Sequence, residues 1–226
     1  MKKAAVLLSG GLDSTTLLHY VVKTLKAEEV FALSFDYGQK HSRELDVAAW
    51  QCEQLEQVKE HNILDLSFMG GFLGASSALV KGGVEVPELK DIAEDDLDQP
   101  VTYVPNRNMM LLSIAASYAE SRECRNLFYG AQAQDEYGYW DCTEDFLDRM
   151  NAVFSLNRRT GVNVEAPFVN MSKGVVAGIG LKLGVDYSKT WTCYRGGEYP
   201  CGVCPSCAER TLAFKECKAE DPLLKN

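Results

Sequence analysis

Apolar residues in the first third of the chain alternate between short continuous runs and helical spacing. The runs cover residues 4–9, 30–35 and 62–66, and their length suits strands that are buried on both faces of a sheet. Between them, residues 14–26 and 42–59 repeat apolar positions at helical spacing. This order of strands and helices predicts an α/β fold with a doubly wound parallel sheet.

Beyond an irregular middle stretch the pattern predicts four more helices and one more strand. They are helices over 109–120, 143–156, 172–183 and from after Cys207 to about Cys217, and a strand over 126–131. Thr143 and Ser172 precede two of these helices, and their side-chain oxygens are expected to cap them. We expect residues 1–187 to form the α/β domain, with a solvated, mobile acidic excursion near 81–100, and residues 188–226 to form a small segment packed on it.

Composition restricts the cellular setting and the partners. The chain has 226 residues, and none of its apolar runs is long enough to cross a bilayer or to serve as a signal peptide, so we expect a cytoplasmic protein without membrane contact. A formal net charge of −9 argues against binding a large nucleic acid, because such binding depends on many Lys and Arg contacts to phosphates.

A glycine-rich loop follows the first predicted strand and precedes the first helix. Gly10 and Gly11 allow the backbone to approach an anion, and the N-terminus of the helix adds N–H donors. Asp13 is expected to hold a Mg²⁺ ion that bridges phosphates. The loop resembles the pyrophosphate-binding loop of the N-type ATP pyrophosphatases, and the alternative is a turn without a ligand. The residues expected to bind ATP here are Leu8, Ser9, Gly10, Gly11, Leu12, Asp13, Ser14, Thr15 and Thr16.

The end of the second predicted strand lies at the edge of the sheet where such folds bind ligands. Asp36, Tyr37 and Gln39 are therefore candidate site residues, and in the N-type ATP pyrophosphatases the backbone here recognises adenine. His41 is close in sequence, and a site residue or a structural histidine are both open interpretations.

Four of the eight cysteines form a tight cluster near the C-terminus. Cys193, Cys201, Cys204 and Cys207 could supply the four thiolates of a closed tetrahedral Zn²⁺ site, one structural ion per chain. An iron–sulfur cluster and a three-cysteine site with one free thiolate are the alternatives. The other cysteines, which are scattered, are mostly expected to be small buried residues; they are Cys52, Cys124, Cys142 and Cys217.

Several segments in the same order along nearly the whole chain resemble the QueC family of queuosine biosynthesis. They are residues 9–16, 36–39, 102–108, 137–142, 172–173 and 190–207. The resemblance implies a Rossmann-like fold of the adenine nucleotide alpha hydrolase type, a homodimer, and a ligase that forms carbon–nitrogen bonds. Its implied reaction uses ATP and ammonia to convert 7-carboxy-7-deazaguanine into 7-cyano-7-deazaguanine.

The resemblance also implies roles for individual residues. Asp13, Arg107 and Lys173 are the expected catalytic residues, with Asp36 and Gln39 among the ATP-binding residues. The residues expected to bind the deazaguanine base are Tyr37, Asp135, Tyr139 and Asp141. Where the family commonly has glycine this chain has Asn106, which is expected to adopt a left-handed conformation in its place. Trp140 replaces a common proline and is expected to alter the substrate pocket.

Three other functions are compatible with parts of this pattern. A related enzyme of the same superfamily could act on another modified nucleobase. A tRNA-thiolating enzyme could use the same loop and cysteines, although the acidic composition argues against it. A non-catalytic, zinc-stabilised module could bind nucleotide without turnover.

Overall fold

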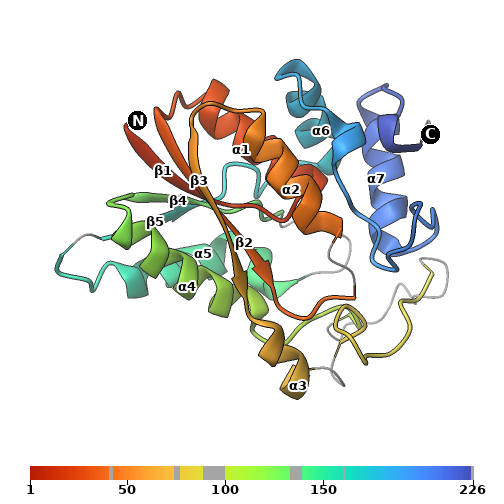
Figure 1. Cartoon of the computed structure of the whole chain (residues 1–226), viewed down its shortest axis with the longest axis horizontal. Coiled ribbons are helices and arrows are strands. Elements are labelled where there is room, and N and C mark those ends of the chain that lie inside the picture. The colour runs from red at the N-terminus through yellow and green to blue at the C-terminus, as the bar shows by residue number, and fades with distance from the viewer. Residues whose placement is uncertain (41–42, 74–76, 89–99, 133–138, 160, 225–226) are drawn as a thin grey trace.

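The computed structural model is a three-layer α/β structure with a central sheet (Figure 1). It describes residues 1–40, 43–73, 77–88, 100–132, 139–159 and 161–224. The strands are β1 Lys3–Leu7, β2 Glu29–Asp36, β3 Val58–Asp65, β4 Asn126–Phe128 and β5 Asn163–Glu165. The helices are α1 Leu12–Lys23, α2 Arg43–Glu53, α3 Gly70–Leu73, α4 Arg107–Ser121, α5 Glu144–Phe154, α6 Lys173–Lys182 and α7 Pro205–Glu216, with short 3₁₀ turns at Ser67–Met69, Trp140–Cys142, Tyr187–Lys189 and Pro222–Leu224.

The five strands are parallel and lie in the order β3-β2-β1-β4-β5. Helices α1, α2 and α6 lie on one side of the sheet, and α4 and α5 lie on the other (Figure 1). The sheet has a hydrophobic core on each face, and β1 contributes to both because its successive side chains point to opposite faces. Ala4 and Val6 pack with α1, whereas Ala5 and Leu7 pack with α4. The predicted doubly wound parallel sheet is confirmed.

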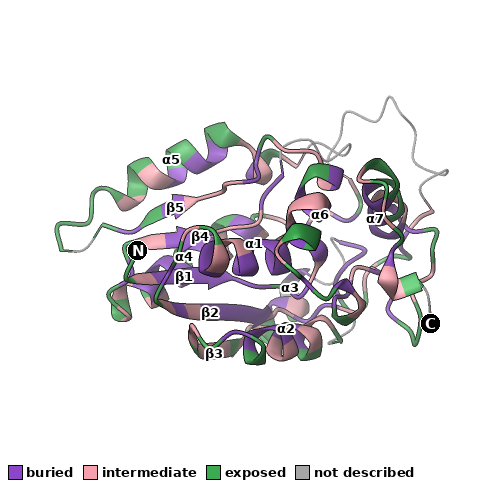
Figure 2. Ribbon diagram, turned by 90° about the horizontal axis from the view of Figure 1, so that it is seen from above, coloured by how far each residue is buried: buried purple, intermediate pink, exposed green. Residues whose placement is uncertain are grey.

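Burial decreases from the centre of the sheet to its edge. Figure 2 shows that β1, in the middle of the sheet, is mainly buried, whereas α5 carries many exposed residues. Edge strand β3 contains no fully buried residue among its eight. None of the helices in the described part of the chain combines the length and the apolarity that crossing a bilayer requires.

Two predicted helix boundaries were wrong. The helix predicted over 42–59 ends at Glu53, and Val58 already begins β3, paired with Val30. Leu55, in the connecting turn, is buried in the same core as α2, so the apolar spacing continued past the end of the helix. The last helix begins at Pro205, which suits a first helical position, so Cys207 lies within the helix instead of before it.

The helix predicted over 14–26 is α1, which runs from Leu12 to Lys23, whereas local signals placed the starts of α5 and α6 correctly. The Oγ1 of Thr143 accepts a hydrogen bond from the Phe146 amide at 3.2 Å, and the Oγ of Ser172 accepts one from Val175 at 3.2 Å. The predicted caps of α5 and α6 are therefore confirmed. Strand β5 was not predicted, because a three-residue strand with polar ends has no period to detect.

Part of the acidic excursion packs against the C-terminal segment. Val86 is buried beside Cys193, and the Arg195 guanidinium donates hydrogen bonds to the Val86 carbonyl oxygen at 3.0 and 3.3 Å. The acidic residues expected in this excursion lie within 89–99, outside the described residues.

Candidate active site

A cavity of about 300 Å³ lies at the carboxyl ends of the strands. Strands β2 and β4 flank β1 on opposite sides, so the chain leaves β1 and β4 toward different faces of the sheet. Such a switch point opens a crevice that binds ligands in many parallel α/β folds. Residues from the loop after β1, from the loop after β4 and from the start of α4 all line this cavity.

The loop between β1 and α1 is held in shape by its own polar groups. The hydroxyls of Ser9 and Ser14 are 3.0 Å apart, and the Ser9 amide donates to the Ser14 hydroxyl at 3.1 Å. Among the described residues, no side chain caps α1 at Gly11. The first N–H groups of the helix are therefore left for an anion, such as a phosphate.

At Gly10 the backbone of the loop passes close to the backbone of α2. Its φ is +79°, and a Cβ atom at this position would overlap the Glu44 carbonyl oxygen. Its own carbonyl oxygen accepts a hydrogen bond from the Trp191 amide at 2.9 Å. Glycine here lets the loop approach α2 and the C-terminal segment closely.

Asp13 and Lys173 face each other across the mouth of the loop. Lys173 Nζ lies 3.9 Å from the Asp13 carboxylate and 2.6 Å from the carboxylate of Glu209 on α7. The three side chains are between 13% and 24% exposed, and Asp13 and Lys173 line the cavity. These three charged side chains connect the starts of α1 and α6 to the middle of α7.

Arg107 forms the opposite wall, at the first position of α4. Its guanidinium lies 5.5 Å from the centre of the Tyr37 ring and donates a hydrogen bond to the Tyr37 hydroxyl at 3.3 Å. Asn106, the residue before it, has φ +53° and ψ +19°. The predicted left-handed turn at Asn106 is confirmed, and it directs Arg107 into the cavity.

The carboxamide of Gln39 links the end of β2 to α2. Its Nε2 donates to the Phe35 carbonyl oxygen at 3.2 Å and to Oε1 of Glu44 at 3.1 Å, while its Oε1 accepts from the Tyr37 amide at 2.8 Å. Burial raises the pKa of Glu44 to about 7, although Arg107 and Gln39 oppose this shift. Gln39 and Glu44 both line the cavity.

The structure brings together only part of the residue set expected to bind ATP. Leu8, Ser9, Gly11, Leu12, Asp13, Ser14 and Gln39 line the cavity. Thr16 points the other way and bonds the Leu12 carbonyl oxygen and, at 2.6 Å, the Tyr187 hydroxyl. Gly10, Thr15 and Asp36 also lie outside the described lining, and Asp36 accepts a hydrogen bond from the Gly38 amide at 3.1 Å.

Only some of the residues expected to bind the base line the cavity. Tyr37 and Tyr139 line the cavity, and the Tyr139 hydroxyl is 2.5 Å from Oγ1 of Thr102. Asp141 is buried and lies outside the described lining; burial raises its pKa, and its Oδ1 has no hydrogen-bond partner among the described residues. Trp140 stacks edge-on against Phe146, 5.4 Å between ring centres, outside the described lining. Asp135 and His41 lie outside the described residues.

The four clustered cysteines form a compact set of sulfur ligands. The Sγ atoms of Cys193, Cys201, Cys204 and Cys207 all lie within 4.8 Å of one another, so the cluster can hold a metal ion. The cluster packs against Trp191, and Trp191 and Tyr194 in turn line the cavity. A metal at this position would therefore fix one wall of the candidate active site.

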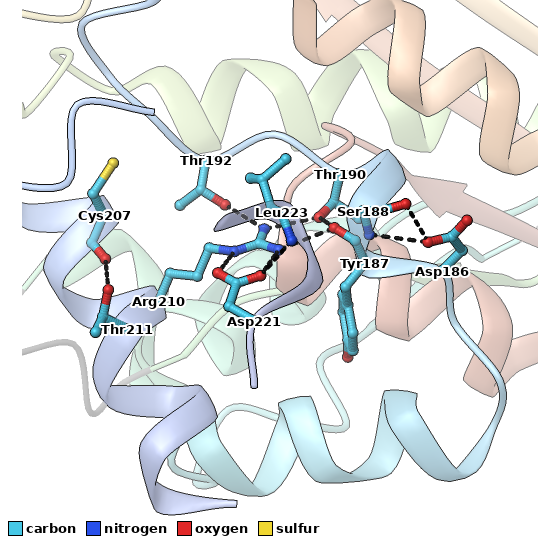
Figure 3. Close-up of polar contacts among 10 residues, drawn as sticks. All are labelled: Asp186, Tyr187, Ser188, Thr190, Thr192, Cys207, Arg210, Thr211, Asp221 and Leu223. Atoms are coloured by element: carbon cyan, nitrogen blue, oxygen red, sulfur yellow. Dashed lines mark hydrogen bonds and ion pairs between the residues drawn. The ribbon is translucent and has the colours of Figure 1, made fainter. Parts of the chain in front are cut away.

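A buried arginine ties the same segment to the body of the protein (Figure 3). Arg210 on α7 donates to the hydroxyls of Thr190 and Thr192 at 2.8 and 3.1 Å, and to the Tyr187 carbonyl oxygen at 3.0 Å. It also pairs with Asp221. Since Arg210 lines the base of the cavity, this network sets the position of Trp191 and its neighbours.

Several lining residues were missed by sequence reasoning. They are Glu44, Tyr129, Gln132, Cys142 and Arg210. Cys142, taken as one of the scattered buried cysteines, is partly exposed to the cavity, with its sulfur 3.6 Å from the Tyr129 hydroxyl. The sequence holds no local signal for Glu44 or Arg210, because both look like ordinary polar positions of amphipathic helices.

Comparison with known proteins finds a family model that covers nearly the whole chain. The family model "Queuosine biosynthesis protein QueC" matches residues 3–218. A 7-cyano-7-deazaguanine synthase of Caldicellulosiruptor saccharolyticus is 47% identical over 221 residues, covering 98% of this chain and 94% of its own length. The 7-cyano-7-deazaguanine synthase 1 of Colwellia psychrerythraea is 41% identical over 222 residues, covering 98% of each chain.

Solved structures with low sequence identity share the fold. The U34-tRNA thiolase NcsA of Methanococcus maripaludis, determined with its [4Fe-4S] cluster, aligns with a TM-score of 0.51 at 18% identity and covers 95% of this chain, which spans 63% of that protein. The NMN synthetase of Francisella tularensis aligns with a TM-score of 0.51 at 14% identity, over 96% of this chain and 77% of its own.

Proposed function

The chain belongs to the QueC family of queuosine biosynthesis proteins, and on this premise we propose that it converts 7-carboxy-7-deazaguanine, ammonia and ATP into 7-cyano-7-deazaguanine. A carboxylate does not react with ammonia, because oxide is a very poor leaving group. Transfer of an adenylyl or phosphoryl group to the carboxylate creates a good leaving group, and ammonia then gives an amide. A second activation, of the amide oxygen, permits dehydration to the nitrile.

The loop from Ser9 to Ser14 would hold the ATP phosphates for both activations. Its backbone N–H groups and hydroxyls are donors, and α1 adds the positive end of its dipole. The Asp13 carboxylate is a hard oxygen donor beside this loop, which fits a Mg²⁺ ion. When bound there, Mg²⁺ would neutralise charge on the phosphates. Lys173 and Arg107 would stabilise the negative charge that develops as the leaving group departs.

The wall formed by Tyr37, Arg107 and Tyr139 would hold the deazaguanine. The flat face of the Tyr37–Arg107 pair offers stacking area, and the hydroxyl of Tyr139 offers a hydrogen bond. The unpartnered Oδ1 of Asp141 would accept a hydrogen bond from the base once substrate or water reaches it. Asp135, on the same segment, is assigned to the base on the family resemblance alone.

We assign Zn²⁺ as the ion of the cysteine cluster, one per chain, because four sulfur ligands without an open position suit a structural zinc site. None of the eight cysteines, all in described parts of the chain, forms a disulfide, which suits the reducing cytoplasm, and we propose this as the protein's location. We also propose a homodimer, as the family resemblance implies, and light scattering in solution would test this.

One observation supports the proposed reaction most directly: the phosphate loop and the Tyr37–Arg107 wall line the same cavity. The test is to incubate the protein with ATP, Mg²⁺, ammonium and the carboxylated deazaguanine and to determine the product mass. We expect the nitrile, whose mass equals acid plus ammonia minus two waters. Tight ATP binding without turnover would instead favour a non-catalytic nucleotide-binding module.

A further inference from the structure

The proposed reaction needs ammonia, which exists mostly as the protonated and non-nucleophilic ammonium ion at neutral pH. We propose that Glu44 binds this ammonium ion and removes its proton, so that ammonia is released beside the activated carboxyl group. This inference rests on the proposed function, and it adds a catalytic residue that the phosphate loop and the base-binding wall do not provide.

Glu44 lies at the cavity but apart from the phosphate site at Asp13. Among the described residues, Asp13 and Glu44 are the two that line the cavity with carboxylates. Asp13 faces Lys173 at the mouth of the phosphate loop, 3.9 Å away. Glu44 lies on the other side of that loop, on the first turn of α2, where its backbone carbonyl crosses Gly10. The two carboxylates therefore come from different elements and can serve different cations.

The hydrogen bonds of Glu44 leave one oxygen for a ligand. Oε1 accepts from Gln39, whose carboxamide is itself fixed by Phe35 and Tyr37. Oε2 accepts no hydrogen bond from any residue that the structure describes. A carboxylate held in place at one oxygen and open at the other suits a ligand that donates protons, such as ammonium.

The charges around Glu44 suit a group that both binds a cation and accepts a proton. Arg107 on α4 faces it from across the cavity and favours the carboxylate, whereas Asp36 at the end of β2 disfavours it. Lys40, on the loop before α2, also lines the cavity. Burial has the largest effect and raises the pKa of Glu44 to about 7. An acid with this pKa is a far better proton acceptor at neutral pH than an exposed glutamate.

Ammonium transfers one proton to Oε2 of Glu44 and becomes ammonia. The nitrogen lone pair then forms the C–N bond, and the C–O bond to the activating phosphate breaks, with its electron pair leaving on the phosphate. The nitrogen loses its second proton to water, and Glu44 releases its own proton to water before the next turnover.

The two half-reactions provide a selective test, because amide formation consumes ammonia and dehydration of the amide does not. Both consume ATP. We therefore propose to measure both in the Glu44→Gln variant, supplying the carboxylate with ammonium in one assay and the ready-made amide in the other. Glu53→Gln, on the exposed side of the same helix, is the matched control.

We expect Glu44→Gln to lower kcat/KM for ammonium by about 10²-fold or more, the usual contribution of a general base, and to leave amide dehydration within about twofold of the parent. In the parent, the ammonium-dependent rate should rise with pH through about 7 as Glu44 ionises, and this inflection should be lost in the variant. Dehydration at the parent rate also shows that the variant is folded.

Other outcomes would overturn the inference. An equal loss in both half-reactions would mean that Glu44 serves ATP or the base instead of ammonia. Parent rates in both half-reactions would mean that Glu44 has no role in the reaction. If the parent protein itself forms neither amide nor nitrile, the proposed function fails, and that result is distinct from a failure of the variant alone.

Discussion

Arg210 and Asp221 form a buried ion pair with two parallel hydrogen bonds. Nε of Arg210 lies 2.6 Å from Oδ2 of Asp221, and a terminal nitrogen lies 2.8 Å from Oδ1. The side chains are only 3% and 4% exposed. With the bonds to Tyr187, Thr190 and Thr192, all five N–H groups of the guanidinium have partners (Figure 3). The pair holds the guanidinium in place, and the bonds of the same guanidinium to Thr190 and Thr192 connect α7 to the segment that carries Trp191 into the cavity.

Replacing Asp221 by Asn should destabilise the protein strongly. The substitution leaves a buried guanidinium without its counter-charge, and breaking one partner of a buried pair usually costs about 3–5 kcal/mol. Denaturant unfolding would measure the loss. Asp148→Asn, an exposed change on α5, is the control and should be nearly neutral. Equal stability of the two variants would show that Arg210 finds other compensation.

Removing the metal should loosen the wall of the active site. We expect about one zinc ion per chain by elemental analysis, and Cys204→Ser should lose it because Cys204 is a fully buried member of the ligand set. Thermal stability and nitrile formation should fall together in that variant. Cys217→Ser, outside the cluster, should retain the metal. Iron and sulfide in the purified protein would contradict the zinc assignment.

The sequence predicted those parts of the site that are local in the chain. The spacing of the four cysteines places their sulfur atoms together because turns bring near neighbours into contact, and the left-handed turn at Asn106 follows from the residue itself. The last two residues of the predicted phosphate loop do not line the cavity. A helix rotates by about 100° per residue, so Asp13 and Ser14 face the cavity whereas Thr15 and Thr16 turn into the core.

Residues that reach the site through tertiary packing could not be predicted in this way. Glu44 lies in the first turn of an amphipathic helix, and only the crossing of α2 over Gly10 brings it to the cavity. Arg210 looks like a surface position of α7, yet it is 3% exposed, because the residues after the helix fold back and place Asp221 against it. Neither contact leaves a periodic or spacing signal in the chain.

Gly10→Ala should lower the free energy of unfolding by more than the same substitution at a glycine with open space around it. The left-handed backbone alone costs about 1–2 kcal/mol for a residue with a Cβ. At Gly10 the added atom would also overlap the Glu44 carbonyl oxygen, so α2 must shift. Gly184→Ala is the control, because its φ is +72° and nothing lies within 4 Å of an added Cβ. Similar unfolding free energies for the two variants would show that the crossing adjusts without cost.

Stability in acid should depend on Glu60. The hydrogen bond from Arg122 is the main cause that lowers the pKa of Glu60 from 4.5 to about 2. The folded state therefore favours the ionised carboxylate, so the stabilisation is complete above pH 4.5 and is lost as the pH falls toward 2. The effect should be small, because the side chains of Arg122 and Glu60 are 36% and 30% exposed. The unfolding free energies of the parent and of Glu60→Gln should differ at pH 6 and converge in acid. A difference that stays constant with pH would show that ionisation of Glu60 does not stabilise the fold.

Asp13→Ala should abolish nitrile formation while the fold stays intact. Asp13 is on the first turn of α1, partly exposed to the cavity, and its carboxylate is the proposed Mg²⁺ ligand. Loss of the metal would remove several kcal/mol of charge stabilisation, so we expect the rate to fall by about 10³-fold or more. Asp46→Ala, an exposed change near the start of α2, controls for the loss of a charge at a helix end. The Mg²⁺ dependence of ATP binding separates the two possible roles of Asp13. If Asp13 holds the ion, the variant should bind ATP with little response to Mg²⁺, and near-normal turnover would show that the ion is held elsewhere.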